Sequence, residues 1–169
     1  PMVALTFDDG PHYTVTPRIL DILQKNNARA TFFVLGNRVD NFPNIIQREY
    51  SQGHEIGSHS FSHPQITTLT SEEIEYQFTE TEHRIQQYVP YTTKLIRPPY
   101  GQITQSLKEV LQKTFVLWSI DTQDWKTRDK DAIVSEVLNN VKDGDIILMH
   151  DMYSTTADAC EELIPALIE

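Results

Sequence analysis

The sequence predicts an α/β fold in which parallel strands alternate with helices. Short segments rich in β-branched and aromatic residues, bounded by Gly, Pro or Asp, alternate with longer stretches of helical periodicity. This alternation is typical of parallel strands joined by crossover helices. It leaves open whether the sheet is doubly wound or closed into a barrel. The predicted strands are Val3–Phe7, Ala30–Leu35, Glu55–Ser58, Lys94–Arg97, Phe115–Ile120 and Asp145–Met149.

Helix start signals lie between these strands. Thr16 and Pro17 have the residue types of an N-cap and a first helical position. Thr70 and Glu73 have the spacing of a capping box, which predicts a helix that begins near residue 70. Pro165 lies within the last helical period, and we expect it to kink or divide that helix.

Composition and charge narrow the class of protein. The 169 residues are 39% hydrophobic and contain no repeat or linker, which predicts one globular domain over residues 1–169. No apolar run approaches the ~18 residues of a membrane helix, and no signal-peptide pattern is present. The net charge of −10, with no basic stripe, disfavours nucleic acid and anionic membranes as partners. Cys160 is the single cysteine, so an intrachain disulfide is excluded, and no pattern predicts an oligomer.

Residues capable of catalysis or metal binding follow five of the predicted strands. No glycine-rich phosphate-binding motif accompanies them, so a nucleotide site is not expected. The carboxyl ends of parallel strands meet at one edge of a sheet, where α/β proteins build their sites. We therefore expect these side chains to surround one site. They come in pairs: Asp8 and Asp9, His59 and His63, Arg97 and Tyr100, Asp121 and Asp124, His150 and Asp151.

His59 and His63 are the first candidates for metal binding. Their spacing would place both imidazoles on one face of a helical turn, where they could share a metal ion. Two histidines and one carboxylate, with coordination positions left open, are typical of a catalytic metal site. The neighbouring Asp8 and Asp9 can supply the carboxylate. Taken alone, the two histidines would more often be ordinary surface or core residues.

Asp8 and Asp9 form a carboxylate pair whose side chains point in different directions as the chain leaves a strand. One can bind a metal while the other acts as a base on a water molecule. The residue pattern leaves open which aspartate has which role. The sequence Asp-Asp-Gly-Pro is also ordinary turn chemistry.

The other strand ends offer groups for charge stabilisation and proton transfer. Arg97 can hold a carboxylate in its ionised form, and the stiff Pro98–Gly101 loop can aim a backbone N–H at an oxyanion. Asp124 can orient His150 and raise its pKa, which suits a general acid. Trp125 can line a sugar-binding pocket. A surface ion pair, a core histidine and a core tryptophan are the plain alternatives.

Five motifs occur in a recognisable order: TFDDGP at residues 6–11, HSFSH at 59–63, RPPY at 97–100, DTQDW at 121–125 and LMH at 148–150. In these motifs the chain resembles the NodB-homology polysaccharide deacetylases, carbohydrate esterase family 4. The resemblance covers nearly the whole chain and is greatest to the peptidoglycan N-acetylglucosamine deacetylases of Gram-positive bacteria. It implies a distorted (β/α) barrel of about seven parallel strands.

The resemblance also implies a divalent metal, most often Zn²⁺, with Co²⁺, Mn²⁺ or Ni²⁺ as alternatives. It implies that Asp9, His59 and His63 bind this metal. In the same family pattern Asp8 is the catalytic base, and Arg97 holds it.

The remaining motif residues receive their roles from the resemblance in the same way. The Tyr100 backbone N–H is expected to contribute to the oxyanion hole. Asp124 is expected to tune His150, the general acid. Trp125 and Leu148 are expected to line the pocket for the acetyl methyl group.

The expected reaction is the removal of N-acetyl groups from N-acetylglucosamine residues of a polysaccharide, peptidoglycan or chitin, with release of acetate. The resemblance places such an enzyme outside the cell or in the cell envelope. O-deacetylation of an acetylxylan-like polysaccharide by the same residues is the first alternative. A non-catalytic sugar-binding domain and a 2-His-1-carboxylate iron oxygenase are the others, and strand–helix alternation argues against the oxygenase. Family members usually continue into a final strand, so we expect a domain trimmed at both ends that lacks it.

Overall fold

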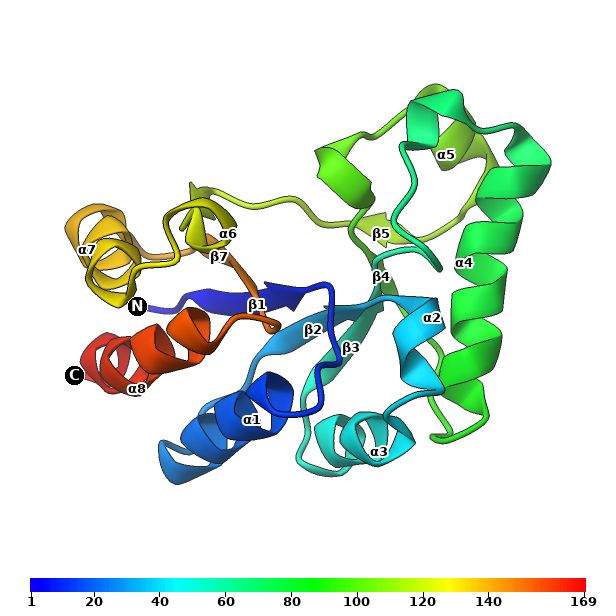
Figure 1. Cartoon of the computed structure of the whole chain (residues 1–169). Helices are drawn as coiled ribbons and strands as arrows, with labels where there is room; N and C mark the ends of the chain where they lie inside the picture. Colours follow the sequence, from blue (N-terminus) through cyan, green and yellow to red (C-terminus); the bar gives the residue numbers. More distant parts are fainter.

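Seven parallel strands form one curled sheet in the computed structural model, which describes all 169 residues (Figure 1). This architecture confirms the predicted fold class of a distorted (β/α) barrel. The strand order across the sheet is β5-β4-β3-β2-β1-β7-β6. The strands are β1 (Ala4–Asp8), β2 (Thr31–Val34), β3 (Glu55–Ser58), β4 (Leu95–Ile96), β5 (Thr114–Phe115), β6 (Ile120–Asp121) and β7 (Ile146–His150).

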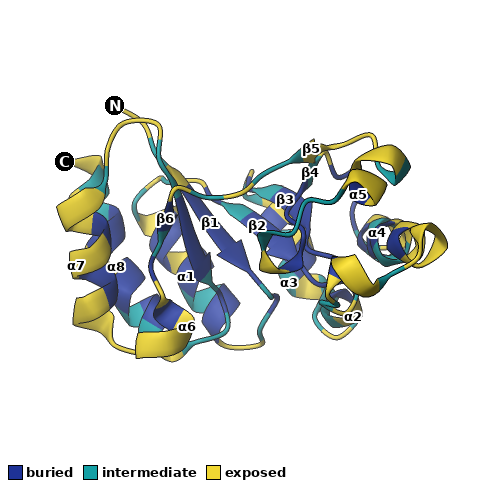
Figure 2. Cartoon of the chain, turned by 90° about the horizontal axis from the view of Figure 1, so that it is seen from above, coloured by how far each residue is buried: buried dark blue, intermediate teal, exposed yellow.

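Helices cover the outer, convex face of this sheet (Figures 1 and 2). Figure 2 shows the buried residues along the strands and on the helix faces that meet them, with exposed residues on the outside. No helix is both long and apolar enough to cross a membrane. The α-helices are α1 (Val15–Lys25), α2 (Gly36–Val39), α3 (Pro43–Ser51), α4 (Ser71–Gln86), α5 (Gln105–Val110), α6 (Asp124–Thr127), α7 (Lys130–Asn140) and α8 (Ser154–Ile168); the 3₁₀ turns are η1 (Ile66–Thr68) and η2 (Pro99–Gly101).

Alternation along β1 separates the core from the concave face of the sheet. Leu5 and Phe7 belong to a cluster of 26 buried apolar residues under the helices. Thr6 and Asp8 point the other way and contact Arg97, as the period of two in a strand requires. The sheet therefore packs one face against helices and offers polar groups on the other.

The single strand predicted over Phe115–Ile120 is wrong. Two short strands form there, at opposite edges of the sheet: β5 pairs with β4, and β6 pairs with β7. The residues between them cross the open side of the sheet, as Figure 1 shows for the yellow-green segment after β5. Arg97 accounts for this path, since its guanidinium donates to the carbonyls of Val116 and Leu117 at 3.2 and 2.8 Å.

The helix ends agree only in part with the start signals. The capping box of Thr70 and Glu73 is confirmed at the start of α4. The start predicted at Thr16 is wrong, because α1 begins at Val15 and the Thr16 hydroxyl instead donates to the Asp151 carboxylate at 2.7 Å. Pro165 does not divide α8, since it lies in the last turn and removes only one hydrogen bond there.

Candidate functional site

The carboxyl ends of the strands surround a pocket of about 400 Å³ on the concave side of the sheet. All five motifs contribute to it or to the groups that support it. Arg97 and Asp124 are fully buried behind the wall. The lining residues are Asp8, Asp9, His59, His63, Tyr100, Trp118, Asp121, Trp125, Leu148, His150 and Tyr153.

The backbone around this pocket is unusually strained. Apart from glycine, positive φ angles occur at seven residues of the chain, and six of these belong to the loops that carry the site. Left-handed backbone costs free energy for a residue with a Cβ and persists only where surrounding contacts enforce it. Such clustering is typical of functional sites. The six residues are Asp9, Ser60, His63, Tyr100, Gln123 and Arg128.

Asp9, His59 and His63 bring three potential metal ligands together. Their ligand atoms lie within 4.8 Å of one another, and Asp9 Oδ1 is 3.4 Å from His59 Nε2 and 3.6 Å from His63 Nε2. The two histidines do not share a helical turn as predicted. They belong to an irregular loop with left-handed residues at Ser60 and His63, which turns the two rings toward each other, with centroids 4.9 Å apart.

The chemistry of these donors fits a divalent cation. Asp9 Oδ1 is buried and has no hydrogen-bond partner, which costs free energy unless a cation compensates for it. His59 Nδ1 lies 2.6 Å from the Arg97 carbonyl. Because a carbonyl only accepts, Nδ1 carries the proton and Nε2 keeps a lone pair toward the cluster. Burial lowers the pKa of His59 to about 4, so its ring is neutral, as a metal ligand must be.

Asp8 and Arg97 form a buried ion pair beside this cluster. Arg97 Nη1 donates to Asp8 Oδ1 at 2.9 Å and to the Thr6 hydroxyl at 2.7 Å. Burial raises the pKa of Asp8, and the charge of Arg97 opposes this effect. Asp8 Oδ2 faces the cluster, 3.5 Å from His59 Nε2. One carboxylate oxygen is therefore anchored while the other borders the pocket.

His150 and Asp124 form a second polar pair across the pocket. His150 Nδ1 lies 2.7 Å from Asp124 Oδ1, and the His150 backbone N–H donates to Asp124 Oδ2 at 2.7 Å. Burial acts to lower the pKa of His150. The hydrogen bond to Asp124 and the charges of Asp124, Asp8 and Asp9 outweigh it and raise that pKa to about 9. His150 is therefore protonated at neutral pH, with Nε2 4.0 Å from Asp9 Oδ2.

Tyr100, Trp125 and Leu148 form the walls of the pocket. Tyr100 and Trp125 are 60% and 49% exposed, whereas Leu148 is buried, so the two rings border the entrance and Leu148 lies deeper. The Tyr100 ring packs edge-on against His63, with centroids 4.8 Å apart. The Tyr100 amide donates to no backbone carbonyl, which leaves this N–H available to a ligand.

Several groups that complete the site received no predicted role, although one of them, Thr6, belongs to the first motif. Thr6 supports Arg97, and its position two residues before Asp8 could have indicated this, since the two share a strand face. The Thr156 hydroxyl donates to Asp124 Oδ2 at 2.7 Å. Trp118 and Tyr153 line the pocket without any signal in the sequence pattern, because loop segments bring them there.

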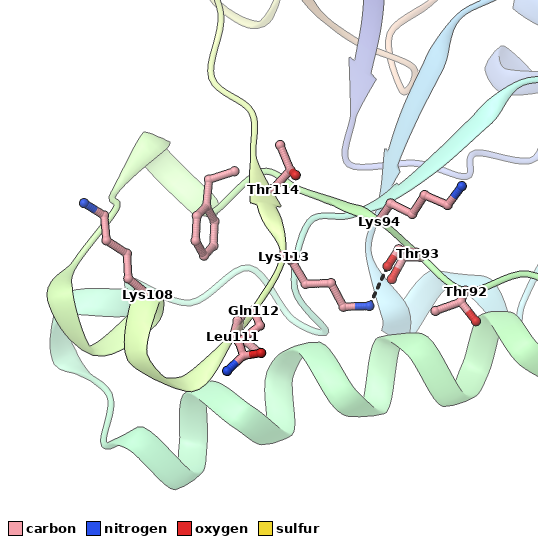
Figure 3. A pocket seen from close by; sticks show the side chains of 9 residues that line it. Thr92, Thr93, Lys94, Lys108, Leu111, Gln112, Lys113 and Thr114 are labelled. Atoms are coloured by element: carbon pink, nitrogen blue, oxygen red, sulfur yellow. Dashed lines mark hydrogen bonds between the residues drawn. The ribbon is translucent and has the colours of Figure 1, made fainter.

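A larger hollow, of about 770 Å³, lies at the amino ends of β4 and β5, away from the site (Figure 3). Three lysines line it: Lys94, Lys108 and Lys113. Figure 3 shows Lys94 and Lys108 extending away from each other, and Lys113 Nζ donates to the Thr93 carbonyl at 2.6 Å. The lysines do not converge, so this hollow lacks the arrangement of a binding site.

Comparison with known proteins identifies the family. Residues 1–116 match the family model described as polysaccharide deacetylase. The chain is 44% identical over 99% of its length to peptidoglycan-N-acetylmuramic acid deacetylase PdaC of Bacillus subtilis, and its structure superposes on that of PdaC with a TM-score of 0.96, covering 98% of this chain and 82% of the other. It is 41% identical over 98% of its length to peptidoglycan-N-acetylglucosamine deacetylase PgdA of Listeria monocytogenes.

The chain spans about a third of these curated relatives, 36% of PdaC and 35% of PgdA. A third similar structure is a family 4 acetyl xylan esterase from Clostridium thermocellum in complex with cobalt. Its TM-score is 0.94 at 38% identity, covering 99% of this chain and 84% of the esterase chain. With the matched family model, the ordered motifs and this shared fold, the chain belongs to the polysaccharide deacetylase family.

Proposed function

We propose that this chain is a metal-dependent hydrolase that removes N-acetyl groups from N-acetylglucosamine residues of a cell-wall glycan and releases acetate. One observation carries the proposal: an anchored carboxylate and a protonated imidazole border a single three-ligand cluster. Asp8 is held by Arg97 at 2.9 Å, and His150 is held by Asp124 at 2.7 Å. A base and an acid on two sides of one centre are what hydrolysis of an amide requires.

Asp9, His59 and His63 are the residues that we propose to hold the metal. Two imidazole nitrogens and one carboxylate oxygen suit Zn²⁺, and Co²⁺, Mn²⁺ and Ni²⁺ accept the same donors. When bound, such a cation supplies Lewis acidity, which polarises a carbonyl and makes a water molecule easier to deprotonate. The cobalt complex of the similar esterase supports a metal role for this cluster.

The proton transfers follow from the two held groups. Asp8 takes a proton from a water molecule while the water oxygen bonds to the acetamide carbon, and the carbonyl electron pair moves onto the carbonyl oxygen. The Tyr100 N–H lies free to stabilise that oxyanion. His150 then gives its proton to the sugar nitrogen as the carbon–nitrogen bond breaks, which leaves acetate and a free amine.

The nature of the polymer is part of the proposal. The names of PdaC and PgdA favour an N-acetyl group on peptidoglycan over an O-acetyl ester on xylan. A peptidoglycan substrate would place the site at the cell envelope. Exposed rings of Tyr100 and Trp125 at the pocket entrance suit the apolar faces of a sugar.

The test is acetate release from peptidoglycan, chitooligosaccharides and acetylated xylan, first with a chelator and then with Zn²⁺ or Co²⁺ added back. Removing a general base or acid costs about 10²–10⁴ in rate, so Asp8→Asn and His150→Ala should lose at least that much activity. Asp131→Asn, an exposed carboxylate on α7, is the matched control and should retain full activity. Metal-independent turnover, or near-normal rates in Asp8→Asn, would contradict the mechanism. Acetate from xylan alone would replace the amide substrate with an ester.

A further inference from the structure

Arg128 is an unpaired cation at the rim of the site. The chain has 24 acidic and only 14 basic side chains. Four of its seven arginines, Arg18, Arg48, Arg84 and Arg97, pair with a carboxylate, and Arg29, Arg38 and Arg128 do not. Arg128 pairs with none, although it is exposed and free to reach one. An arginine left unpaired in so acidic a chain is available for an anion from outside.

The local backbone and two contacts fix where the Arg128 guanidinium points. Its backbone is left-handed, with φ 47° and ψ 38°, at the end of α6. Its Nε donates to the Trp125 carbonyl at 2.8 Å, and its Cζ lies 3.6 Å from the centre of the Tyr153 ring. The side-chain entropy of an exposed arginine is thereby reduced before any ligand binds. No hydrogen bond or ion pair joins the two terminal amino groups to a carboxylate or carbonyl of this chain, so they can still donate to a ligand while the guanidinium lies against the Tyr153 side chain.

The two residues that hold Arg128 are themselves walls of the pocket. Trp125 and Tyr153 line it together with Asp9, His59 and His63. The guanidinium is thus placed just outside the residues that would surround the reacting sugar. A group bound by Arg128 would belong to the same glycan, at a neighbouring sugar or its substituent.

We propose that Arg128 determines specificity by binding a carboxylate of the glycan, so that the site favours a carboxylate-bearing strand over a neutral one. The inference rests on the proposed function, since peptidoglycan carries carboxylates and chitin does not. A planar guanidinium matches a carboxylate in a bidentate, charge-assisted contact. The net charge of −10 repels an anionic polymer in general. A single oriented cation would therefore favour the one placement of the polymer that brings its carboxylate to Arg128.

Two sources of that carboxylate occur on peptidoglycan: the lactyl group of a muramic acid without its peptide, and the stem peptide. Three matched glycans separate them. Chitotetraose is neutral, a glycan strand stripped of peptides exposes lactyl carboxylates, and an intact strand presents peptide carboxylates. The substrate on which Arg128 matters identifies the source.

The experiment measures kcat and KM of the zinc-loaded chain for each glycan, in the wild type, Arg128→Gln and Arg128→Lys. Loss of one charge-assisted contact at an exposed rim should raise KM for the carboxylate-bearing glycan about tenfold at low salt, with a much smaller change in kcat. The ratio of kcat/KM for that glycan over chitotetraose should fall by the same factor. Lysine keeps the charge but not the fork, so Arg128→Lys should recover only part of the loss. Arg29→Gln, which removes an equal charge at the far end of the strands, should leave both values unchanged.

Binding measured without turnover separates this inference from the proposed function. An NMR titration compares chitobiose with the N-acetylglucosamine–N-acetylmuramic acid disaccharide, which has a free lactyl carboxylate, and with the same disaccharide carrying a stem peptide. Weaker binding of either carboxylate-bearing ligand to Arg128→Gln, with chitobiose unaffected, supports the inference even if no acetate is released. Equal loss on all ligands would mean that Arg128 only supports Trp125 and Tyr153, and no loss would mean that it touches no substrate. Either result would overturn the inference.

Discussion

The two ends of the sheet are built very differently. Around β1, β2 and β7 lies the large cluster of 26 buried apolar residues, and β1 and β7 pair over five residues. At the other end β4 and β5 have only two residues each. There the small cluster holds five buried residues, Ile66, Ile74, Phe78, Ile96 and Leu107.

The site joins these two ends, and each supplies a different kind of group. Asp8 and His150, which we propose to move protons, stand at the last positions of β1 and β7 and so share the rigidity of the large cluster. Tyr100 follows the short β4 in a left-handed turn. Arg97 connects the two ends, because it leaves β4 and bonds to Thr6 and Asp8 of β1. One buried arginine therefore holds the part of the site beside the small cluster in position against the part beside the large cluster.

Breaking that connection should have the largest effect. In Arg97→Met, Asp8 would remain buried without its partner, and losing one member of a buried pair costs about 3–5 kcal/mol. Urea unfolding of the metal-free chain measures this loss of stability. Acetate release should fall far more than the decrease in the fraction of folded protein explains. A variant close to wild type in both measurements would show that the two ends hold together without Arg97.

Truncating one leucine in each cluster compares the two ends directly. Leu23 and Leu107 are both fully buried, and Leu→Ala in a core costs about 2–5 kcal/mol. Leu23→Ala in the large cluster should lie near the upper end of this range, because close packing there prevents collapse around the cavity. Leu107→Ala should lie near the lower end, because the short α5 can move inward. Chemical unfolding at constant slope checks the order, and a reversed order would mean that the small cluster is the stiffer one.

His54 gives the large cluster a pH-dependent stability. Burial lowers the pKa of His54 from its ordinary value of 6.5 to about 4, and its Nδ1 accepts from the Ala30 N–H at 3.2 Å. Between pH 6.5 and 4 the unfolded chain binds a proton that the folded chain refuses, so stability is present above pH 6.5 and is lost as the pH falls toward 4. Replacing the His54 imidazole by a group that does not titrate should raise the free energy of unfolding at pH 4 by about 1–3 kcal/mol.

His54→Asn tests this dependence, since an amide oxygen can replace Nδ1 as the acceptor and does not titrate. The free energy of unfolding of the metal-free chain, measured from pH 7 to 4, should fall less steeply in the variant. His59 has a similar lowered pKa and remains in both proteins, so the difference between them isolates His54. Parallel curves would assign the acid sensitivity elsewhere.

The smallest effect should come from Thr70→Ala, which removes the N-cap of α4 beside the small cluster. The Thr70 side chain accepts from the Glu73 N–H at the start of α4, and losing such a cap costs about 1 kcal/mol. Thr14, the N-cap residue of α1, makes no side-chain cap hydrogen bond, so Thr14→Ala should cost only a few tenths of that. Thermal unfolding of the two variants measures the contrast. Equal losses would show that the cap at α4 adds nothing beyond helix propensity.

Sequence periodicity could predict five of the strands because each lies in a short segment rich in β-branched or aromatic residues. Such a segment can be identified without knowing which strand it pairs with. It could not predict that residues 115–120 divide between two edges of the sheet, since each short strand contributes a single apolar residue, Phe115 or Ile120, and only the partner strands distinguish them. The spacing of His59 and His63 likewise predicted a helical turn, whereas the structure has an irregular loop there. The actual loop depends on left-handed residues at Ser60 and His63 that contacts with neighbouring loops maintain.

The sequence by itself determined the α/β class, the five ordered motifs and the edge of the sheet where the site forms, because strand alternation and residue type are local properties. The residue pattern alone could not separate Asp8 from Asp9; the family resemblance gave them different expected roles, and the tertiary structure shows their different surroundings. One faces Arg97 at 2.9 Å and the other faces His59 and His63, and this depends on groups 50 or more positions away in the chain. The same holds for Arg128, whose stacking on Tyr153 at 3.6 Å no spacing indicates. Contacts between distant residues are settled by packing, and packing exists only in the folded chain.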